Sequence, residues 1–292
     1  MKNEKLTNLV ADIDKKIFEL ENIKNEIYTS TKSLKLENLA TVSKRVKNKP
    51  VVPKFMTGVN IIDKKMGGFS AGSFINIAGE NFSGKTTLVL KILSNIAEHK
   101  PVVFFSYEMY ENLLVNNKFK YSSQNIKNNL FIEQKRNKLS DIKSIIESEA
   151  KKGVVFFAID SRMKIKTDDN LQEFQKNSLI SQTLSKLTQE LGIIILLINQ
   201  IALADLRSGR LEFKGSGDTS YDSDVSFFIV VDDGNKKENS IQKRLLICSK
   251  DRINERTWKE DITDYSYSKP PVITKFQDEP EINVDENLTD YF

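Results

Sequence analysis

The stretch GENFSGKTT, residues 79–87, gives the strongest indication of the fold of this chain. It matches the pattern G-x-x-x-x-G-K-[ST], with Gly79, Gly84, Lys85 and Thr86 at the fixed positions. An apolar run of strand length precedes it, and a run with helical spacing of its apolar residues follows it. A strand, this motif and then a helix is the order in which the pattern forms a phosphate-binding loop, so the stretch predicts a nucleotide site.

The chemistry of a triphosphate explains the residue types in this loop. Glycines let the backbone curl, so that N–H groups of residues 82–87 point at the phosphates from the N-terminus of the helix. The ammonium group of Lys85 reaches the β- and γ-phosphates, and the hydroxyl of Thr86 holds Mg²⁺. We therefore expect ATP and Mg²⁺ as cofactors. The expected nucleotide-binding residues are Gly79, Ser83, Gly84, Lys85, Thr86 and Thr87.

Composition and charge limit the class of protein. A chain of 292 residues is long enough for one large α/β domain with an appendage. The net charge of +4 does not by itself indicate nucleic-acid binding, which only local clusters of basic residues could indicate. The lone cysteine, Cys248, cannot form an intramolecular disulfide. No apolar run approaches the roughly 18 residues of a membrane-spanning helix, and the N-terminal residues do not resemble a signal peptide. We therefore expect a cytoplasmic protein without a membrane partner.

From residue 55 to residue 268, apolar runs of strand length alternate with helical stretches. This alternation predicts an α/β core with a mostly parallel, twisted sheet flanked by helices. The run VVFFAID (154–160) is apolar almost throughout, as expected of a strand that is buried on both faces. The late runs at 226–232 and 244–250 lack full helical crossovers, so we expect the sheet to end in antiparallel strands.

A short helical extension and a linker, residues 1–54, precede this core. Its first part predicts an amphipathic helix, because apolar residues recur among Lys, Glu, Asn and Asp. Two interpretations stay open: the helix packs on its own domain, or it packs on a neighbouring subunit. The apolar positions that lie seven residues apart are Leu6, Ile13, Leu20 and Ile27.

Residues 269–292 form an acidic, proline-containing tail, which we expect to be disordered. The tail ends DENLTDYF (285–292), with acidic residues before an aromatic residue and the terminal carboxylate. One interpretation is that this tip docks a replication or repair protein. The other is that the tail only keeps the protein soluble.

Three polar residues close strands of the predicted sheet. Asp160 ends VVFFAID, Gln200 ends IIILLINQ, and Glu108 follows the strand in FFSYEM. Because the carboxyl ends of parallel strands meet at the ligand-binding edge, we expect these side chains beside the phosphate-binding loop. Asp160 then contacts Mg²⁺ together with Thr86, and a carboxylate at Glu108 can polarise the attacking water. The amide of Gln200 can sense a γ-phosphate, although capping of the strand end explains it equally.

Two cations follow the last strong strand, in SKDR. Lys250 and Arg252 are one residue apart on an extended segment, so they project from the same face. Hydrolysis of ATP needs positive charge in the transition state, and a neighbouring subunit often supplies it. Exposed basic pairs are common, so this pair alone is weak evidence.

Taken together, the order and spacing of these features resemble the RecA-like core of the DnaB-type replicative helicases, without their usual N-terminal domain. The segment MTGVNIIDKKMGGFSAGSFINIAGENFSGKTTLVLKI looks like the beginning of that core, and FFSYEM, VVFFAID, LLINQ and SKDR follow in the family's order. The resemblance covers about residues 55–260. It implies a RecA-like P-loop NTPase fold and a homo-oligomer, in the form of a hexameric ring, with ATP between subunits. It also implies roles for four residues: Glu108 as catalytic base, Gln200 as γ-phosphate sensor, and Lys250 and Arg252 as a finger acting on a neighbour's nucleotide.

The resemblance also gives a meaning to two loops, one after Asp160 and one after Gln200. In RecA-like rings such loops face the central channel and hold single-stranded DNA, and basic side chains can bind its phosphates. From the residues alone, solvated surface loops are the alternative. The expected DNA-binding residues are Arg162, Lys164 and Lys166 in the first loop and Arg207, Arg210 and Lys214 in the second.

These features predict an ATP-hydrolysing, single-stranded-DNA-binding motor of the DnaB-like class, a DNA helicase in replication. Two alternatives remain. The first is a RecA- or RadA-like recombination ATPase that forms filaments or rings. The second is a regulatory or loader ATPase without unwinding activity. The chain departs from the family pattern in its short N-terminal region and in the turn INERT after the finger.

Overall fold

The computed structural model describes residues 37–47, 52–167, 171–201, 222–232 and 243–263, together with six helical positions between Ile13 and Ile23. The chain divides into two compact units, Met1–Val51 and Val52–Phe292.

In the first unit, the positions described near the N-terminus are helical and exposed, among them the apolar residues Ile13, Ile17 and Leu20. The rest of the predicted amphipathic helix lies outside the described residues, so the partner of its apolar seam stays a prediction. A second helix, α2 (Leu39–Lys47), begins where Asn38 caps it, with the side-chain oxygen of Asn38 accepting from the backbone N–H of Thr41 at 2.9 Å. The last turn of α2 carries three basic residues, which suits the negative end of the helix dipole.

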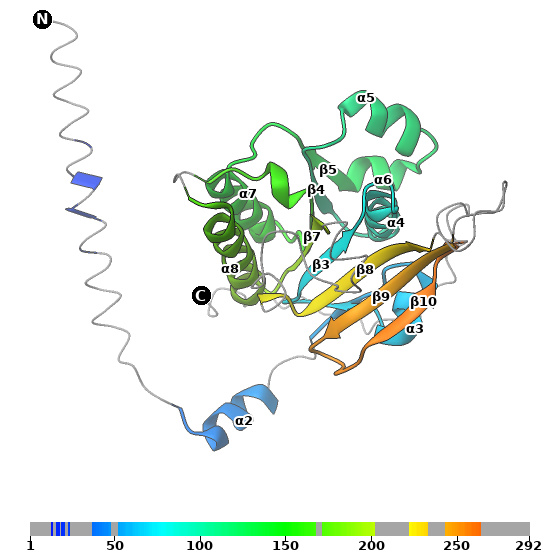
Figure 1. Ribbon diagram of the computed structural model, residues 1–292. Coiled ribbons are helices and arrows are strands. Elements are labelled where there is room, and N and C mark those ends of the chain that lie inside the picture. Colours follow the sequence, from blue (N-terminus) through cyan, green and yellow to red (C-terminus); the bar gives the residue numbers. More distant parts are fainter. Residues whose placement is uncertain are drawn as a thin grey trace, which may run out of the picture. The chain divides into compact units, whose positions relative to one another are not determined.

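The second unit is built on an eight-stranded sheet in the order β10-β9-β8-β3-β7-β6-β4-β5 (Figure 1). From β8 to β5 all neighbouring strands are parallel, whereas β9 runs antiparallel to both β8 and β10. The predicted α/β fold with a mostly parallel sheet and an antiparallel end is therefore confirmed. The strands are β3 (Phe74–Gly79), β4 (Val102–Ser106), β5 (Leu130–Glu133), β6 (Phe156–Asp160), β7 (Ile194–Gln200), β8 (Val225–Asp232), β9 (Lys243–Asp251) and β10 (Trp258–Asp261), beside a small pair, β1 (Lys54–Phe55) and β2 (Phe69–Ser70).

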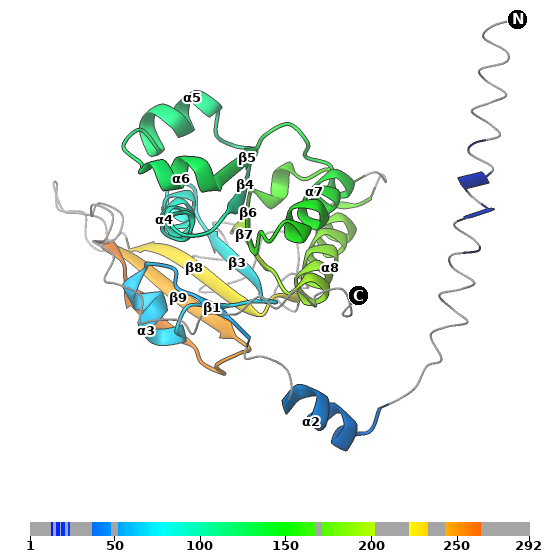
Figure 2. The ribbon, with the colours of Figure 1, turned by 180° about the vertical axis from the view of Figure 1, so that it is seen from behind.

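Helices cover both faces of this sheet, as Figures 1 and 2 show from opposite sides. On one face lie α3 and α4, with α6 beside α4, and on the other lie α7 and α8. Alternate residues of one strand enter the two cores: Phe156 and Ala158 of β6 face the first, and Phe157 and Ile159 face the second. This explains the unbroken apolar runs in the sequence. The helices are α3 (Asn60–Met66), α4 (Lys85–Ala97), α5 (Glu111–Leu113), α6 (Gln124–Asn129), α7 (Leu139–Lys151) and α8 (Glu173–Leu191).

The short α5 is followed by a single π-helical turn, Leu114–Lys118. A one-turn 3₁₀ helix, Arg162–Lys164, follows β6. In the described ranges, no helix is long and apolar enough to cross a membrane.

At the beginning of the core, hydrogen bonds join Asp63 to Thr57 and Gly58, which precede it in the same segment. The carboxylate of Asp63 accepts hydrogen bonds from the backbone N–H and hydroxyl of Thr57, at 2.8 and 2.7 Å, and from the backbone N–H of Gly58 at 2.9 Å. Asp63 thus holds the turn that leads into α3. This part of the motif supports the fold rather than the nucleotide.

Candidate nucleotide-binding site

The loop between β3 and α4 has the tight backbone that phosphate binding requires. A Cβ added at Gly79 would lie 2.6 Å from both the carbonyl oxygen of Ile229 and the hydroxyl of Ser83, so only glycine fits there. Gly84 has φ of +101°, a conformation that side chains disfavour, and α4 begins immediately after it. The loop therefore presents its N–H groups at the positive end of a helix dipole.

Lys85 lies inside this loop with 9% of its surface exposed. Its amine donates to the carbonyl oxygens of Gly79, at 2.9 Å, and Glu80, at 2.7 Å. Burial lowers the pKa of the Lys85 amine, and the carboxylates of Asp160, Glu108 and Glu80 oppose that effect. A cation enclosed by its own loop fits a phosphate chain, whose oxygens can replace the two carbonyls.

Asp160, at the carboxyl end of β6, faces the same space. Its carboxylate accepts a hydrogen bond from the hydroxyl of Thr86 at 2.7 Å, and only 2% of the residue is exposed. Burial raises the pKa of Asp160 to about 6; the Thr86 hydrogen bond and the charge of Lys85 lower it, and the charge of Glu108 raises it further. A hydroxyl beside a buried carboxylate is a donor set that suits Mg²⁺.

The residues present fit Mg²⁺–ATP in two further respects. Within the described ranges, no group of three or more His, Cys, Asp or Glu residues could hold a metal alone, so phosphate oxygens and water would complete the coordination of Mg²⁺. The hydroxyl of Ser83 is buried and has no hydrogen-bond partner in the part of the chain that the structure describes. It is thus available to a ligand in the loop.

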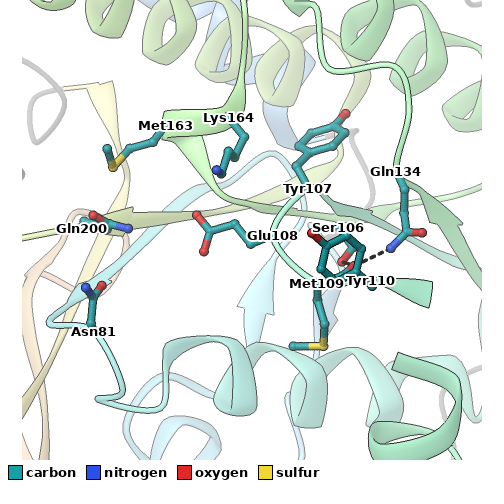
Figure 3. Close-up of a pocket in the computed structure, with 10 residues that line it drawn as sticks. All are labelled: Asn81, Ser106, Tyr107, Glu108, Met109, Tyr110, Gln134, Met163, Lys164 and Gln200. Atoms are coloured by element: carbon teal, nitrogen blue, oxygen red, sulfur yellow. Dashed lines mark hydrogen bonds between the residues drawn. The ribbon is translucent and has the colours of Figure 1, made fainter. Parts of the chain in front are cut away.

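Glu108 lies on the loop that follows β4, close to this group. The hydroxyl of the buried Ser161 donates a hydrogen bond to its carboxylate. The next carbonyl, that of Met109, accepts from the side-chain amide of Gln134 at 2.6 Å and from the hydroxyl of Ser106 at 3.3 Å (Figure 3). The backbone that carries Glu108 is therefore held from the last residue of β4 and from the residue that follows β5.

Two adjacent cavities meet at Glu108. One, of about 490 Å³, is lined by the phosphate-binding loop with Asp160 and Gln200. The other, of about 630 Å³, lies beyond Glu108 and is lined also by Tyr107, Tyr110, Gln134 and Lys164 (Figure 3). Glu108 and Gln200 line both, so the structure brings Lys85, Thr86, Asp160, Glu108 and Gln200 together at one edge of the sheet.

The two finger cations are not part of this group. Because β8 is parallel to β3 and β9 runs back, Lys250 pairs with Ser226 and Arg252 lies beside Asp224, next to the beginning of β3. The phosphate-binding loop follows the other end of β3, which is six residues long. At about 3.3 Å per residue, the two edges are roughly 15–20 Å apart, beyond the reach of an arginine side chain.

The residues predicted to bind DNA differ in their placement. Arg162 is 2% exposed, and burial lowers the pKa of its guanidinium to about 10 against the opposing charge of Glu173. The side chain of Arg162 therefore packs inside the turn after β6 in this conformation, and its contact with DNA stays a prediction. Lys164 and Lys166 are exposed on that turn. The remaining predicted residues, Arg207, Arg210 and Lys214, lie outside the described residues.

The structure adds two residues to the site that the sequence did not indicate. Ser161 directly follows Asp160, and its position beside a strand-ending acid was a usable signal. Arg244, near the beginning of β9, lies against the phosphate-binding loop, since its Nε is 3.9 Å from the position of a Cβ at Gly84. No local pattern marks Arg244, because only the antiparallel return of β9 brings it there.

Comparison with known proteins gives a consistent group of relatives. Residues 55–150 match the family described as DnaB-like helicase C terminal domain. The chain is 25% identical over 274 residues to a protein named replicative DNA helicase DnaB from Treponema pallidum, covering 78% of this chain and 61% of that one. It is 25% identical over 272 residues to the protein of the same name from Rickettsia typhi, covering 75% of this chain and 54% of that one. The chain thus spans little more than half the length of these relatives.

Solved structures show the same fold. One of them, described as an ATPase domain, superposes with a TM-score of 0.62 at 20% identity, covering 78% of this chain and 95% of that one. A DnaB-like replicative helicase, solved in a study of its interactions with primase, gives 0.63 at 20% identity and covers 86% of this chain and 71% of that one. A KaiC-like protein from Pyrococcus horikoshii gives 0.59 at 20% identity, covering 72% of this chain and 94% of that one. At this level of identity, the likeness concerns the fold alone.

Proposed function

Since the RecA-like core of this chain is a DnaB-like helicase C-terminal domain, we propose that the protein is an ATP-hydrolysing motor that acts on single-stranded DNA. In this proposal the protein works as a ring of identical subunits, with each ATP bound between two of them. The observation that carries the proposal is that the phosphate-binding loop and the two finger cations lie at opposite ends of the strands. The loop follows the carboxyl end of β3, and the cations lie beside its amino end.

That placement favours a site shared between subunits. Loss of the γ-phosphate needs positive charge on the side away from the binding loop. Lys250 and Arg252 are too far from their own loop to supply it, yet they lie where the edge of one subunit could meet the nucleotide edge of the next. A head-to-tail arrangement of this kind closes into a ring when the rotation between subunits closes.

Within one subunit, the described residues divide the work of hydrolysis. The loop N–H groups and Lys85 bind the phosphates, and Thr86 and Asp160 hold Mg²⁺, which supplies charge neutralisation at the phosphates when it is bound. Glu108 takes up the proton of the attacking water, in an orientation held by Ser161. Gln200, which precedes the segment 202–221 in the chain, would report the state of the γ-phosphate to that segment.

The exposed Lys164 and Lys166 lie on the turn directly after Asp160 and Ser161, so a DNA phosphate bound there would lie close to the hydrolytic group. Arg207, Arg210 and Lys214 remain predicted DNA contacts. Docking of a replication or repair protein on residues 285–292 also remains a prediction.

Mixing two inactive variants tests the shared site. Arg252→Ala should lower the ATPase rate by roughly 10³-fold or more while nucleotide binding persists, because the transition state loses a charge that the ground state does not need. Lys85→Ala should lose nucleotide binding but keep its finger. Mixed assemblies of the two should regain part of the activity, measured as phosphate release. No recovery in assemblies shown to contain both variants would argue against a shared site.

The ATPase rate with and without single-stranded DNA tests the nature of the motor. We expect stimulation by DNA, reduced in the double variant Lys164→Ala and Lys166→Ala and weakened by salt. No stimulation would favour the regulatory or loader ATPase. Filaments with ATP and DNA in electron microscopy, together with strand exchange, would favour the recombination ATPase.

A further inference from the structure

Asp224 forms hydrogen bonds with the first residue of β3, Phe74, and with Arg252, which directly follows β9. This end of the strands, which carries Lys250 and Arg252, is called the finger edge. Its backbone N–H donates to the carbonyl of Phe74 at 2.8 Å, and one carboxylate oxygen accepts from the backbone N–H of Phe74 at 2.9 Å. Its carbonyl accepts from the backbone N–H of Arg252 at 2.8 Å. Its second carboxylate oxygen accepts from the guanidinium of Arg252 at 3.2 Å. Asp224 thus joins the finger to the beginning of β3.

Asp224 is more buried than Arg252, as expected if a fixed carboxylate orients an exposed guanidinium. The side chain of Asp224 is 14% exposed, whereas that of Arg252 is 53% exposed. An arginine side chain loses rotamer entropy when it is fixed in one conformation. A carboxylate that is itself anchored to the central strand of the sheet restricts that freedom before any second subunit arrives.

The same edge carries a second acid and the second cation. Lys250 lies two residues before Arg252, near the end of β9, and its charge is stabilised by Asp224 and Asp222. Burial and the neighbouring Arg252 act in the opposite direction and lower the pKa of the Lys250 amine. The two acids precede β8 at the place where β9 ends with the two cations. Without the acids, two cations this close would repel each other.

We propose that Asp224 is a positioning residue for hydrolysis: it aims the Arg252 guanidinium out of its own subunit, toward the nucleotide bound by the next one. This inference rests on the proposed shared site and extends it to the residue that prepares the finger. The alternative is an ordinary exposed ion pair, which typically contributes little to stability and nothing to rate.

The substitution Asp224→Asn tests the inference. It keeps the shape of the side chain and an oxygen that can accept from Phe74, but it removes the charge that holds Arg252. We expect kcat to fall by roughly 10-fold or more with little change in KM for ATP, since the finger acts in the transition state.

Glu149→Gln is the matched control for this substitution. Glu149 lies on α7 and pairs at 2.7 Å with Lys152, in an ion pair that again joins a partly buried carboxylate to an exposed cation. The substitution therefore removes the same kind of charge from a different element. The control should keep the wild-type kcat.

Mixed assemblies show whose site is affected. Asp224→Asn mixed with Lys85→Ala should regain activity, because the Asp224→Asn subunit has an intact binding loop and the Lys85→Ala subunit an intact finger. Asp224→Asn mixed with Arg252→Ala should not exceed the rate of Asp224→Asn alone, because neither variant has a fully working finger. A misfolded Asp224→Asn subunit would fail in both mixtures, so recovery also excludes a merely structural effect.

Three results would overturn the inference. The first is a wild-type kcat for Asp224→Asn. The second is recovery by the pair Lys85→Ala and Arg252→Ala without recovery by Lys85→Ala and Asp224→Asn, which would place the action of Asp224 in its own subunit. The third is failure of both pairs in assemblies shown to be mixed. That result removes the shared site itself, and it is thereby distinguishable from failure of the inference alone.

Discussion

At the scale of single residues, Asp160 combines a functional role with a cost to the fold. The residue is 2% exposed, and burial raises the pKa of its carboxyl group from 3.8 to about 6. The ionised form therefore costs the folded state up to about 3 kcal/mol relative to the unfolded chain. Bound Mg²⁺ would offset that cost, so the site is built for a charge that the protein alone does not supply.

Asp160→Asn should raise the stability of the nucleotide-free protein at pH 7 and abolish its stabilisation by Mg²⁺–ATP. The pKa of Asp160 is higher in the folded protein than in the unfolded chain, so its protonated form stabilises the folded wild type at low pH. That stabilisation is lost as pH rises from about 4 to about 6. The variant should lack that loss. Denaturant unfolding at pH 4 and pH 7, with and without Mg²⁺–ATP, measures both effects.

The surface variant Glu147→Gln serves as control for this experiment, because its partner Lys143 is 3.8 Å away and both side chains are exposed. Its unfolding free energy should change by less than about 0.5 kcal/mol. Equal or lower stability of Asp160→Asn at pH 7, relative to the wild type, would contradict the argument from burial.

At the scale of elements, the turn from α3 to β2 shows how the chain brings a short pair of strands onto the core. Gly67 and Gly68 are adjacent, with φ of +70° and +87°. A Cβ at Gly68 would lie 2.4 Å from the backbone carbonyl oxygen of Phe55, whereas a Cβ at Gly67 would meet nothing closer than 3.6 Å, the end of the Lys54 side chain. Both positions need a positive φ, which favours glycine. Only Gly68 also needs the absence of a side chain, because a Cβ there would clash with Phe55.

Gly68→Ala should destabilise the protein more than Gly67→Ala. The left-handed backbone costs each variant about 1–2 kcal/mol. Gly68→Ala loses about 1–3 kcal/mol more, because β1 must move away. Thermal unfolding of the two variants gives the comparison directly. Equal losses would mean that the β1–β2 pair adjusts without cost.

At the scale of the whole molecule, the parallel strands place the phosphate-binding loop after the carboxyl end of β3 and Arg252 beside the other end of that strand. The segment 202–221 joins the nucleotide edge, at Gln200, to the finger edge, at Asp224. One subunit can then bind ATP at one edge while it serves a neighbour with the other. In the proposed ring, the activity belongs to pairs of subunits rather than to single chains.

It follows that the ATPase rate per subunit should rise with protein concentration and reach a plateau once the assembly is complete. Arg252→Ala should remain at its low rate throughout the same range. Phosphate release measured over a dilution series, beside the mass of the species at each concentration, tests this. A constant rate per subunit across the transition from monomer to assembly would contradict a shared site.

Much of the fold could be predicted from local patterns, and so could the strand ends at which the candidate site residues lie. The phosphate-binding loop, the buried strand that ends at Asp160 and the resemblance to the DnaB-type core were predicted from runs of a few residues, because each depends on chain-local geometry or on a short motif. The resemblance to the DnaB-type core and the α/β fold are confirmed. The burial of Arg162 could not be predicted, since a basic residue in a loop gives no sign of how exposed its side chain is.

The sequence by itself determined that a triphosphate loop lies between a strand and a helix, because the glycines and Lys85 act through backbone bonds with their neighbours. Only the tertiary structure decided that Arg252 lies at the far edge from Lys85 and in the hold of Asp224, and that Arg244 lies against the loop. Those facts depend on strand order and direction, which bring together residues separated by up to about 160 positions. Apolar runs specify that a strand forms, but not which way it runs or which strand it joins.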